Sequence, residues 1–144
     1  MQTHHGGCHC GAIRLAFTSA IDPHDMEVRA CQCSFCRRHG SLAAADPHGR
    51  LRVTMREPDR MQRYTFGMRT ADYLVCRNCG VYVAAVTRDT GEPRGIVIVN
   101  ALDDRALFDR TPLEMTYDGE DRQGRIARRR EKWMPVEIGV GEAE

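Results

Sequence analysis

The amino-acid sequence predicts a mainly β protein, built from small antiparallel sheets with little helix. Short segments alternate apolar and polar residues, which is the period of a half-buried strand. Turns rich in Gly, Pro, Asn and Asp separate these segments, and no long segment is an amphipathic helix. Because a chain of 144 residues most often forms one domain, we expect a single domain over 1–144, with its core at about 6–103 and a basic tail at about 118–144.

The first part of the chain supplies two strands and one turn of helix. Alternation makes 13–17 a strand, and a shorter strand over 28–30 leads into a cysteine-rich turn. Segment 34–40 suits a single helical turn, with Ser34 as its N-cap and Gly40 as its terminator. Five further strands are expected, at 51–55, 61–66, 73–75, 81–87 and 95–100.

The tail from residue 118 differs from the rest of the chain because it is polar and rich in arginine. Residues 123–132 suit a short helix, with Trp133 attaching it to the body of the protein before Pro135. Since charge runs are usually solvated, we expect a solvated face or an extended terminal arm, and an anion-binding role is the alternative.

Composition excludes several classes of protein. The formal net charge is +1, whereas nucleic-acid binders are typically strongly basic, so we expect no nucleic-acid partner. No apolar stretch approaches the roughly 18 residues of a membrane span, so we expect no membrane partner. The first residues lack the basic start and apolar run of a signal peptide, which predicts a cytoplasmic protein. Nothing in the sequence indicates the oligomeric state.

All seven cysteines fall in three short clusters. The clusters are a Cys-x-Cys pair (Cys8 and Cys10), a Cys-x-Cys-x-x-Cys triple (Cys31, Cys33 and Cys36) and a Cys-x-x-Cys pair (Cys76 and Cys79). A reducing compartment disfavours disulfides, an odd number cannot pair fully, and a thioredoxin-like redox pair would need a βαβ context that is absent. These spacings are typical of zinc ligands.

The cysteine count favours two zinc sites. The two pairs supply four thiolates, enough for a closed structural site, and the triple supplies three, which leaves an open position. Spacing alone leaves this partition open, and His9, His24 or His39 could complete the triple. Seven thiolates and two zinc ions would change the formal charge from +1 to about −2.

The open site is better suited to a thiol than to an activated water. Three thiolates weaken the Lewis acidity of zinc, so the ion acidifies water less than it would with three histidines. An external thiol would instead be deprotonated and held as a nucleophile. Arg37 and Arg38 follow the triple directly and could bind a carboxylate of an anionic thiol such as glutathione, or could be ordinary surface charge. His39 is a further candidate, for proton transfer.

Three motifs in this order resemble the glutathione-dependent formaldehyde-activating enzyme family over about residues 6–103. The motifs are Gly7-Cys8-His9-Cys10-Gly11, Cys31-Gln32-Cys33-Ser34-Phe35-Cys36-Arg37-Arg38-His39-Gly40 and Cys76-Arg77-Asn78-Cys79-Gly80. The family also includes centromere protein V, and it shares the zinc-bound β fold of the Mss-type Rab exchange factors. The resemblance implies an Mss-type fold of small antiparallel β-sheets built around zinc.

The resemblance also implies roles for the cysteines and a reaction. It makes Cys8, Cys10, Cys76 and Cys79 a structural site and Cys31, Cys33 and Cys36 the ligands of the reactive, catalytic zinc. In the name-giving enzymes the second zinc is associated with glutathione and with formation of S-(hydroxymethyl)glutathione from formaldehyde. We therefore expect a zinc-dependent carbon–sulfur lyase acting on a thiol adduct. The alternative is a non-catalytic, zinc-stapled binding module whose function lies on a surface such as Arg128–Arg130.

Overall fold

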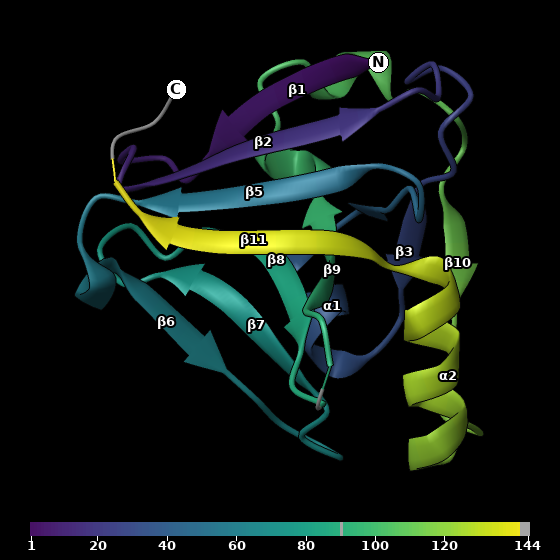
Figure 1. Ribbon diagram of the computed structural model, residues 1–144. Coiled ribbons are helices and arrows are strands. Elements are labelled where there is room, and N and C mark those ends of the chain that lie inside the picture. The colour runs from purple at the N-terminus through teal and green to yellow at the C-terminus, as the bar shows by residue number, and fades with distance from the viewer. Residues whose placement is uncertain (90, 142–144) are drawn as a thin grey trace.

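The computed structural model describes residues 1–89 and 91–141 (Figure 1). Within them the fold is mainly β, which confirms the predicted class. The strands are β1 (Gln2–Gly7), β2 (Ile13–Ser19), β3 (Arg29–Cys31), β4 (Ala43–Ala44), β5 (Arg50–Met55), β6 (Met61–Tyr64), β7 (Ala71–Cys76), β8 (Tyr82–Thr87), β9 (Arg94–Ile98), β10 (Leu113–Met115) and β11 (Met134–Val140). The α-helices are α1 (Ser34–His39) and α2 (Arg122–Lys132), and short 3-10 turns lie at Pro58–Arg60, Val99–Ala101 and Arg105–Leu107.

A layer of β1, β2, β5 and β11 forms one side of the molecule (Figure 1). From β11 the sheet continues to β9, where it branches to β8, β7 and β6 and to β4, β3 and β10. Most neighbours are antiparallel, but β11 pairs parallel with β5 and β10 pairs parallel with β3. The sheet is therefore mixed, whereas the sequence suggested antiparallel pairing throughout. Parallel pairs need long connections, and here the C-terminal strands β10 and β11 pair with strands that lie much earlier in the sequence.

The core is built on the strands with the clearest alternation. Along β2 buried and half-buried residues alternate, and Ile13 and Phe17 are completely buried. Leu51 and Val53 of the antiparallel partner β5 lie in the same core cluster. Each such side chain contributes about 1.5–3 kcal/mol when it is fully buried. This core fixes the strand ends from which the cysteine turns project.

The other predicted strands are present with small changes. Strands β6 to β9 occupy the segments predicted at 61–66, 73–75, 81–87 and 95–100, although β9 ends at Ile98 and a 3-10 turn follows. Strands β1 and β10 were not predicted. The polar residues of β1 alternate in burial but not in hydrophobicity, since His4 is its buried side chain, so the pattern gives no strand signal.

The C-terminal segment is not an extended arm. Helix α2 forms as expected, and Trp133 is buried at its end, but β11 then enters the sheet between β5 and β9. Met134 and Val136 of β11 are buried. Alternating Met134, Val136 and Ile138 carry a strand signal, which Pro135 and the preceding arginine run obscure. Neither described helix combines the length and the hydrophobicity that crossing a bilayer demands.

Candidate metal centres and the adjoining cavity

The four cysteines of the two pairs converge in one cluster. Cys8 and Cys10 lie in the turn between β1 and β2, and Cys76 and Cys79 lie where β7 turns into β8. The Sγ of Cys10 lies 3.7 Å from that of Cys8 and 3.6 Å from that of Cys76, and all four Sγ atoms lie within 4.8 Å of one another. Thiolates at about 2.3 Å from a tetrahedral zinc lie about 3.8 Å apart, so these residues fit that ion.

Backbone and side-chain donors favour ionised sulfur in this four-cysteine cluster. Cys8 and Cys76 are buried, and the N–H of Ile13 donates to the Sγ of Cys8 at 3.2 Å. A hydrogen bond with Asn78 lowers the pKa of Cys10 to about 6, whereas burial raises the pKa of Cys8 to about 12. Buried thiols that cannot all ionise unaided are typical of a site that a cation completes.

The three remaining cysteines form a second cluster around the start of α1. Cys31 ends β3, Cys36 is buried within α1, and the three Sγ atoms lie within 4.8 Å of one another. The N-cap is Cys33 rather than the predicted Ser34, because the Sγ of Cys33 accepts a hydrogen bond from the N–H of Cys36 at 3.3 Å. Gly40 ends the helix in the left-handed conformation with φ of 59°, as predicted.

Ionisation is strongly unequal within this three-cysteine cluster. Hydrogen bonds with Cys31 and Cys36 lower the pKa of Cys33 to about 2. Hydrogen bonding with Cys33 raises the pKa of Cys31, and hydrogen bonding with Cys31 raises the pKa of Cys36. One proton therefore leaves readily and the other two leave only against the first negative charge. A divalent cation would remove that penalty, so the donor set fits zinc.

No histidine, aspartate or glutamate within the described residues joins either cluster. His9 is exposed, and the Nδ1 of His24 lies 3.0 Å from a carboxylate oxygen of Asp109. His39 is exposed, and its ring packs edge-on against Phe35 with centroids 4.5 Å apart. A tetrahedral metal ion would therefore keep one open position at the three-cysteine cluster, whereas the four-cysteine cluster would supply all four ligands.

A cavity of about 290 Å³ opens beside the three-cysteine cluster. Its walls include all three cysteines together with Tyr73, Tyr82 and Trp133. A larger depression of about 470 Å³ lies over β1, β2, β5 and β11, but no cysteine lines it. The smaller cavity is the candidate site, because it combines concave shape with metal-ligating side chains.

Two tyrosines line this cavity with the cysteines, and Tyr73 is half-buried whereas Tyr82 is buried. Tyr73 and Tyr82 both pack against Phe35, with ring centroids 4.9 Å and 5.0 Å from its own. Burial raises the pKa of Tyr73 to about 12 and raises the pKa of Tyr82 well above its ordinary value of 10.0. The hydroxyl of Tyr82 is enclosed and has no hydrogen-bond partner among the described residues. Tyr82 thus keeps a proton that it can donate to a ligand.

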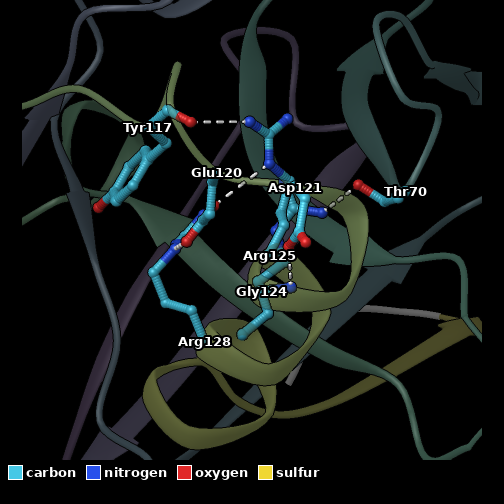
Figure 2. Close-up of polar contacts among 8 residues, drawn as sticks. Thr70, Tyr117, Glu120, Asp121, Gly124, Arg125 and Arg128 are labelled. Atoms are coloured by element: carbon cyan, nitrogen blue, oxygen red, sulfur yellow. Dashed lines mark hydrogen bonds and ion pairs between the residues drawn. The ribbon is translucent and has the colours of Figure 1, made fainter.

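Arginines of α2 form a further wall of the cavity, and Figure 2 shows the polar contacts of Arg125 and Arg128. Arg128 donates from Nε and Nη2 to both carboxylate oxygens of Glu120, at 2.8 Å and 3.1 Å, and its guanidinium stacks 3.7 Å from the ring centroid of Tyr117. Arg125 donates to the same carboxylate at 3.3 Å and to the backbone carbonyl of Tyr117 at 3.0 Å. The hydrogen bond with Arg128 lowers the pKa of Glu120. Asp121 caps the helix by accepting from the N–H of Gly124 at 2.7 Å.

Arg129 is the buried arginine of this wall, with 5% of its surface exposed. Its Nη1 donates to the Oγ1 of Thr70 at 2.6 Å, and its guanidinium lies 4.7 Å from the ring centroid of Trp133. Its Nε is buried without a partner among the described residues. Burial lowers the pKa of Arg129, which an arginine side chain tolerates without losing its proton.

The predicted substrate-binding arginines lie elsewhere. Arg37 and Arg38 are exposed on α1 and do not line this cavity, so their role in binding stays a prediction. Arg125, Arg128 and Arg129, which do line it, were assigned to a solvated tail. Their i, i+3, i+4 spacing places them on one helix face, and this signal was available in the sequence.

Comparison with known proteins agrees with the metal centres. A family model described as "Glutathione-dependent formaldehyde-activating enzyme" matches residues 3–117. The chain is also similar to a Rhodobacter sphaeroides protein whose crystal structure was determined as a structural genomics target. The two are 34% identical, the match covers 76% of this chain and 98% of that one, and the TM-score is 0.57. The family match includes all seven cysteines and ends before α2.

Proposed function

The chain belongs to the glutathione-dependent formaldehyde-activating enzyme family, and from this premise we propose that it is a zinc-dependent carbon–sulfur lyase acting on a thiol adduct. The observation that carries the proposal is that the three-cysteine cluster, with its open position, lines a cavity of about 290 Å³. A non-catalytic module stapled by zinc would need no cavity at that cluster. The best candidate reaction is the addition of glutathione to formaldehyde.

The reaction forms one bond to carbon and needs no oxidant or reductant. The sulfur of a thiol adds to the carbonyl carbon of formaldehyde to give a hydroxymethyl thioether, so a carbon–sulfur bond forms, the carbonyl π bond breaks, and the proton of the thiol is replaced by one on oxygen. A zinc ion bound by Cys31, Cys33 and Cys36 would supply thiolate character to the substrate sulfur at neutral pH. The protein's remaining task is to place the aldehyde and to stabilise charge on its oxygen.

Tyr82 is the candidate donor to that oxygen. Its hydroxyl is buried, has no partner among the described residues and stays protonated, because burial raises its pKa. A hydrogen bond from this hydroxyl would stabilise the negative charge that develops on the aldehyde oxygen as the carbon–sulfur bond forms. The aromatic rings of Phe35, Phe66 and Tyr73 pack against one another, and Phe66 and Tyr73 give the cavity an apolar wall.

The four-cysteine cluster has a structural role in this proposal. It joins the β1–β2 turn to the β7–β8 turn. Cys10 and Cys76, whose Sγ atoms lie 3.6 Å apart, are 66 residues apart in the sequence. Cys8 and Cys76 are buried, and the cluster is separate from the cavity. A zinc ion there would close a long loop and contribute to folding rather than to chemistry.

The test is catalysis of the adduct equilibrium. Exchange between ¹³C-formaldehyde with glutathione and S-(hydroxymethyl)glutathione is followed by NMR with and without the zinc-loaded protein. We expect faster exchange in both directions with an unchanged equilibrium constant. Tyr82→Phe should slow the exchange by about 10²- to 10³-fold, as loss of a donor to a developing oxyanion typically does. Exchange at the uncatalysed rate with fully zinc-loaded protein would contradict the proposal.

A further inference from the structure

Arg129 presents one unused edge of its guanidinium beside the candidate catalytic cavity. Nη1 is held by the Oγ1 of Thr70, and the face of the guanidinium lies against Trp133. Among the described residues neither Nε nor Nη2 has a hydrogen-bond partner. Nε and Nη2 carry the two parallel N–H bonds that bind a carboxylate in bidentate fashion. The unused edge can therefore bind a carboxylate as Nε and Nη2 of Arg128 bind Glu120.

Asp118 is the carboxylate among the residues that line the cavity, and within the described residues it forms no ion pair with Arg129. Glu120 accepts hydrogen bonds from both Arg125 and Arg128, and Arg29, which also lines the cavity, donates to Glu27 at 2.8 Å. Within the part of the chain that the structure describes, Arg129 makes no ion pair. A buried charge without a partner is costly and is rarely retained without a purpose. An anionic ligand in the cavity would supply the missing partner.

The anchoring of Arg129 also suits recognition. Thr70 and Trp133 fix the guanidinium from one end and one face, so little side-chain freedom is lost when a ligand binds. The cavity of about 290 Å³ lies at the lower limit of ligand pockets, so small thiol acids are suitable probes of it. Cys31, Cys33 and Cys36 line the same cavity, so one small molecule can reach both the metal centre and the guanidinium.

We propose that the Nε–Nη2 edge of Arg129 binds a carboxylate of the substrate whose sulfur is held at the three-cysteine cluster. The inference rests on the proposed function, which supplies the thiol that this substrate places at the three-cysteine cluster. Arg129 lies outside residues 3–117, the segment shared with the family. Selection of a carboxylate-bearing thiol is thus a property of the C-terminal segment of this chain, separate from the metal chemistry that the family segment carries.

Matched small thiols test this subsite in the zinc-loaded protein. Mercaptoacetate, 3-mercaptopropionate and 4-mercaptobutyrate vary the reach between sulfur and carboxylate, their carboxamides remove only the charge, and propionate removes the thiol. Binding is measured by calorimetry and by the fluorescence of Trp133, which is the single tryptophan and contacts Arg129. The best-fitting acid should bind at least about tenfold more tightly than its amide, since hydrogen bonds to charged groups contribute that much.

Variants assign the preference to one residue. Arg129→Gln should abolish the difference between acid and amide, and Arg129→Lys, which keeps the charge but not the paired donors, should retain part of it. Arg60→Gln removes an exposed arginine outside the cavity and should keep the full preference. If Arg129→Gln does not fold, Arg129→Lys carries the test, and an undiminished preference in it would contradict bidentate binding.

The outcomes separate this inference from the function it rests on. Equal binding of acid and amide by the wild-type protein would overturn the carboxylate subsite and leave the thiol reaction standing. A preference that survives Arg129→Gln, or that is lost in Arg37→Gln instead, would also overturn it. If the thiol acids bind no more tightly than propionate, yet propionate binding depends on Arg129, the subsite stands and the proposed reaction fails.

Discussion

Cys76→Ser should prevent folding whereas Cys33→Ser should not, although each variant removes one thiol from a cysteine cluster. Cys76 is 1% exposed and belongs to the cluster that joins two distant turns. Structural zinc sites supply about 10–16 kcal/mol of apparent binding free energy at neutral pH, which equals or exceeds the whole stability of a domain, about 5–15 kcal/mol. The Cys76→Ser protein should therefore not fold.

Cys33→Ser should stay folded for two reasons. The Sγ of Cys33 caps α1 by accepting from the N–H of Cys36, and Ser is among the preferred N-cap residues, so its Oγ can replace the sulfur. Even complete loss of the cap costs about 1 kcal/mol, or about 2–4 °C in Tm for a chain of this size. The three-cysteine cluster also closes only a short loop, so its zinc adds little to the stability of the folded state.

Metal analysis combined with thermal unfolding decides between these outcomes. We expect two zinc ions per chain in the wild-type protein and one in Cys33→Ser, which should keep a cooperative transition and lose all acceleration of adduct exchange. Cys33→Ala isolates the cap, since it removes the hydrogen bond as well as the ligand. If Cys33→Ser and Cys76→Ser lose the same stability, the division into an open and a structural site is wrong.

Three further predictions concern the C-terminal segment. Glu120→Gln should lower the free energy of unfolding at pH 7, because the pKa of Glu120 is depressed in the folded protein. The stabilisation by the Glu120 carboxylate is present above its ordinary pKa of 4.5 and is lost as the pH falls through the depressed pKa. Urea titrations of the wild-type protein and the variant should therefore converge at that low pH. Asp121→Ala removes the cap on the N–H of Gly124 and should cost about 1 kcal/mol in urea unfolding, with weaker binding of thiol acids because the arginine wall loosens. Truncation after residue 117 keeps the whole family segment but removes β11 from between β5 and β9, so circular dichroism should show an unfolded chain.

The sequence predicted the cysteine clusters well because their geometry is largely local. A Cys-x-Cys or Cys-x-x-Cys turn brings two sulfurs together whatever the rest of the fold does. The convergence of Cys8 and Cys10 on Cys76 and Cys79 was left open by spacing, because it depends on which turns the sheet brings side by side. The strands that flank these turns were predicted for the same local reason, since β2 and β8 contain their own hydrophobic pattern.

The C-terminal segment could not be predicted with the same ease, because its place depends on long-range pairing. Strand β11 begins with Met134 and Pro135, and it becomes a central strand only because β5 accepts it in parallel register. Once β11 is fixed, Trp133 is buried and α2 is held against the cavity. A charge run that would be solvated in isolation thereby becomes a wall of the site.

The arginines of α2 offset the negative charge that the proposed metal centre would carry. Zinc with three thiolates carries a net negative charge, so an anionic thiol would be repelled from it by like charge. Glu120 holds Arg125 and Arg128 in place, and the three arginines together still exceed Glu120 and the cavity-lining Asp118 in charge. Arg129 then offers its free edge within this positive wall. Under the two proposals above, the family segment supplies the cysteine chemistry and the C-terminal helix controls the approach of an anion, so a relative that lacks this helix should share the metal sites and not the preference for carboxylates.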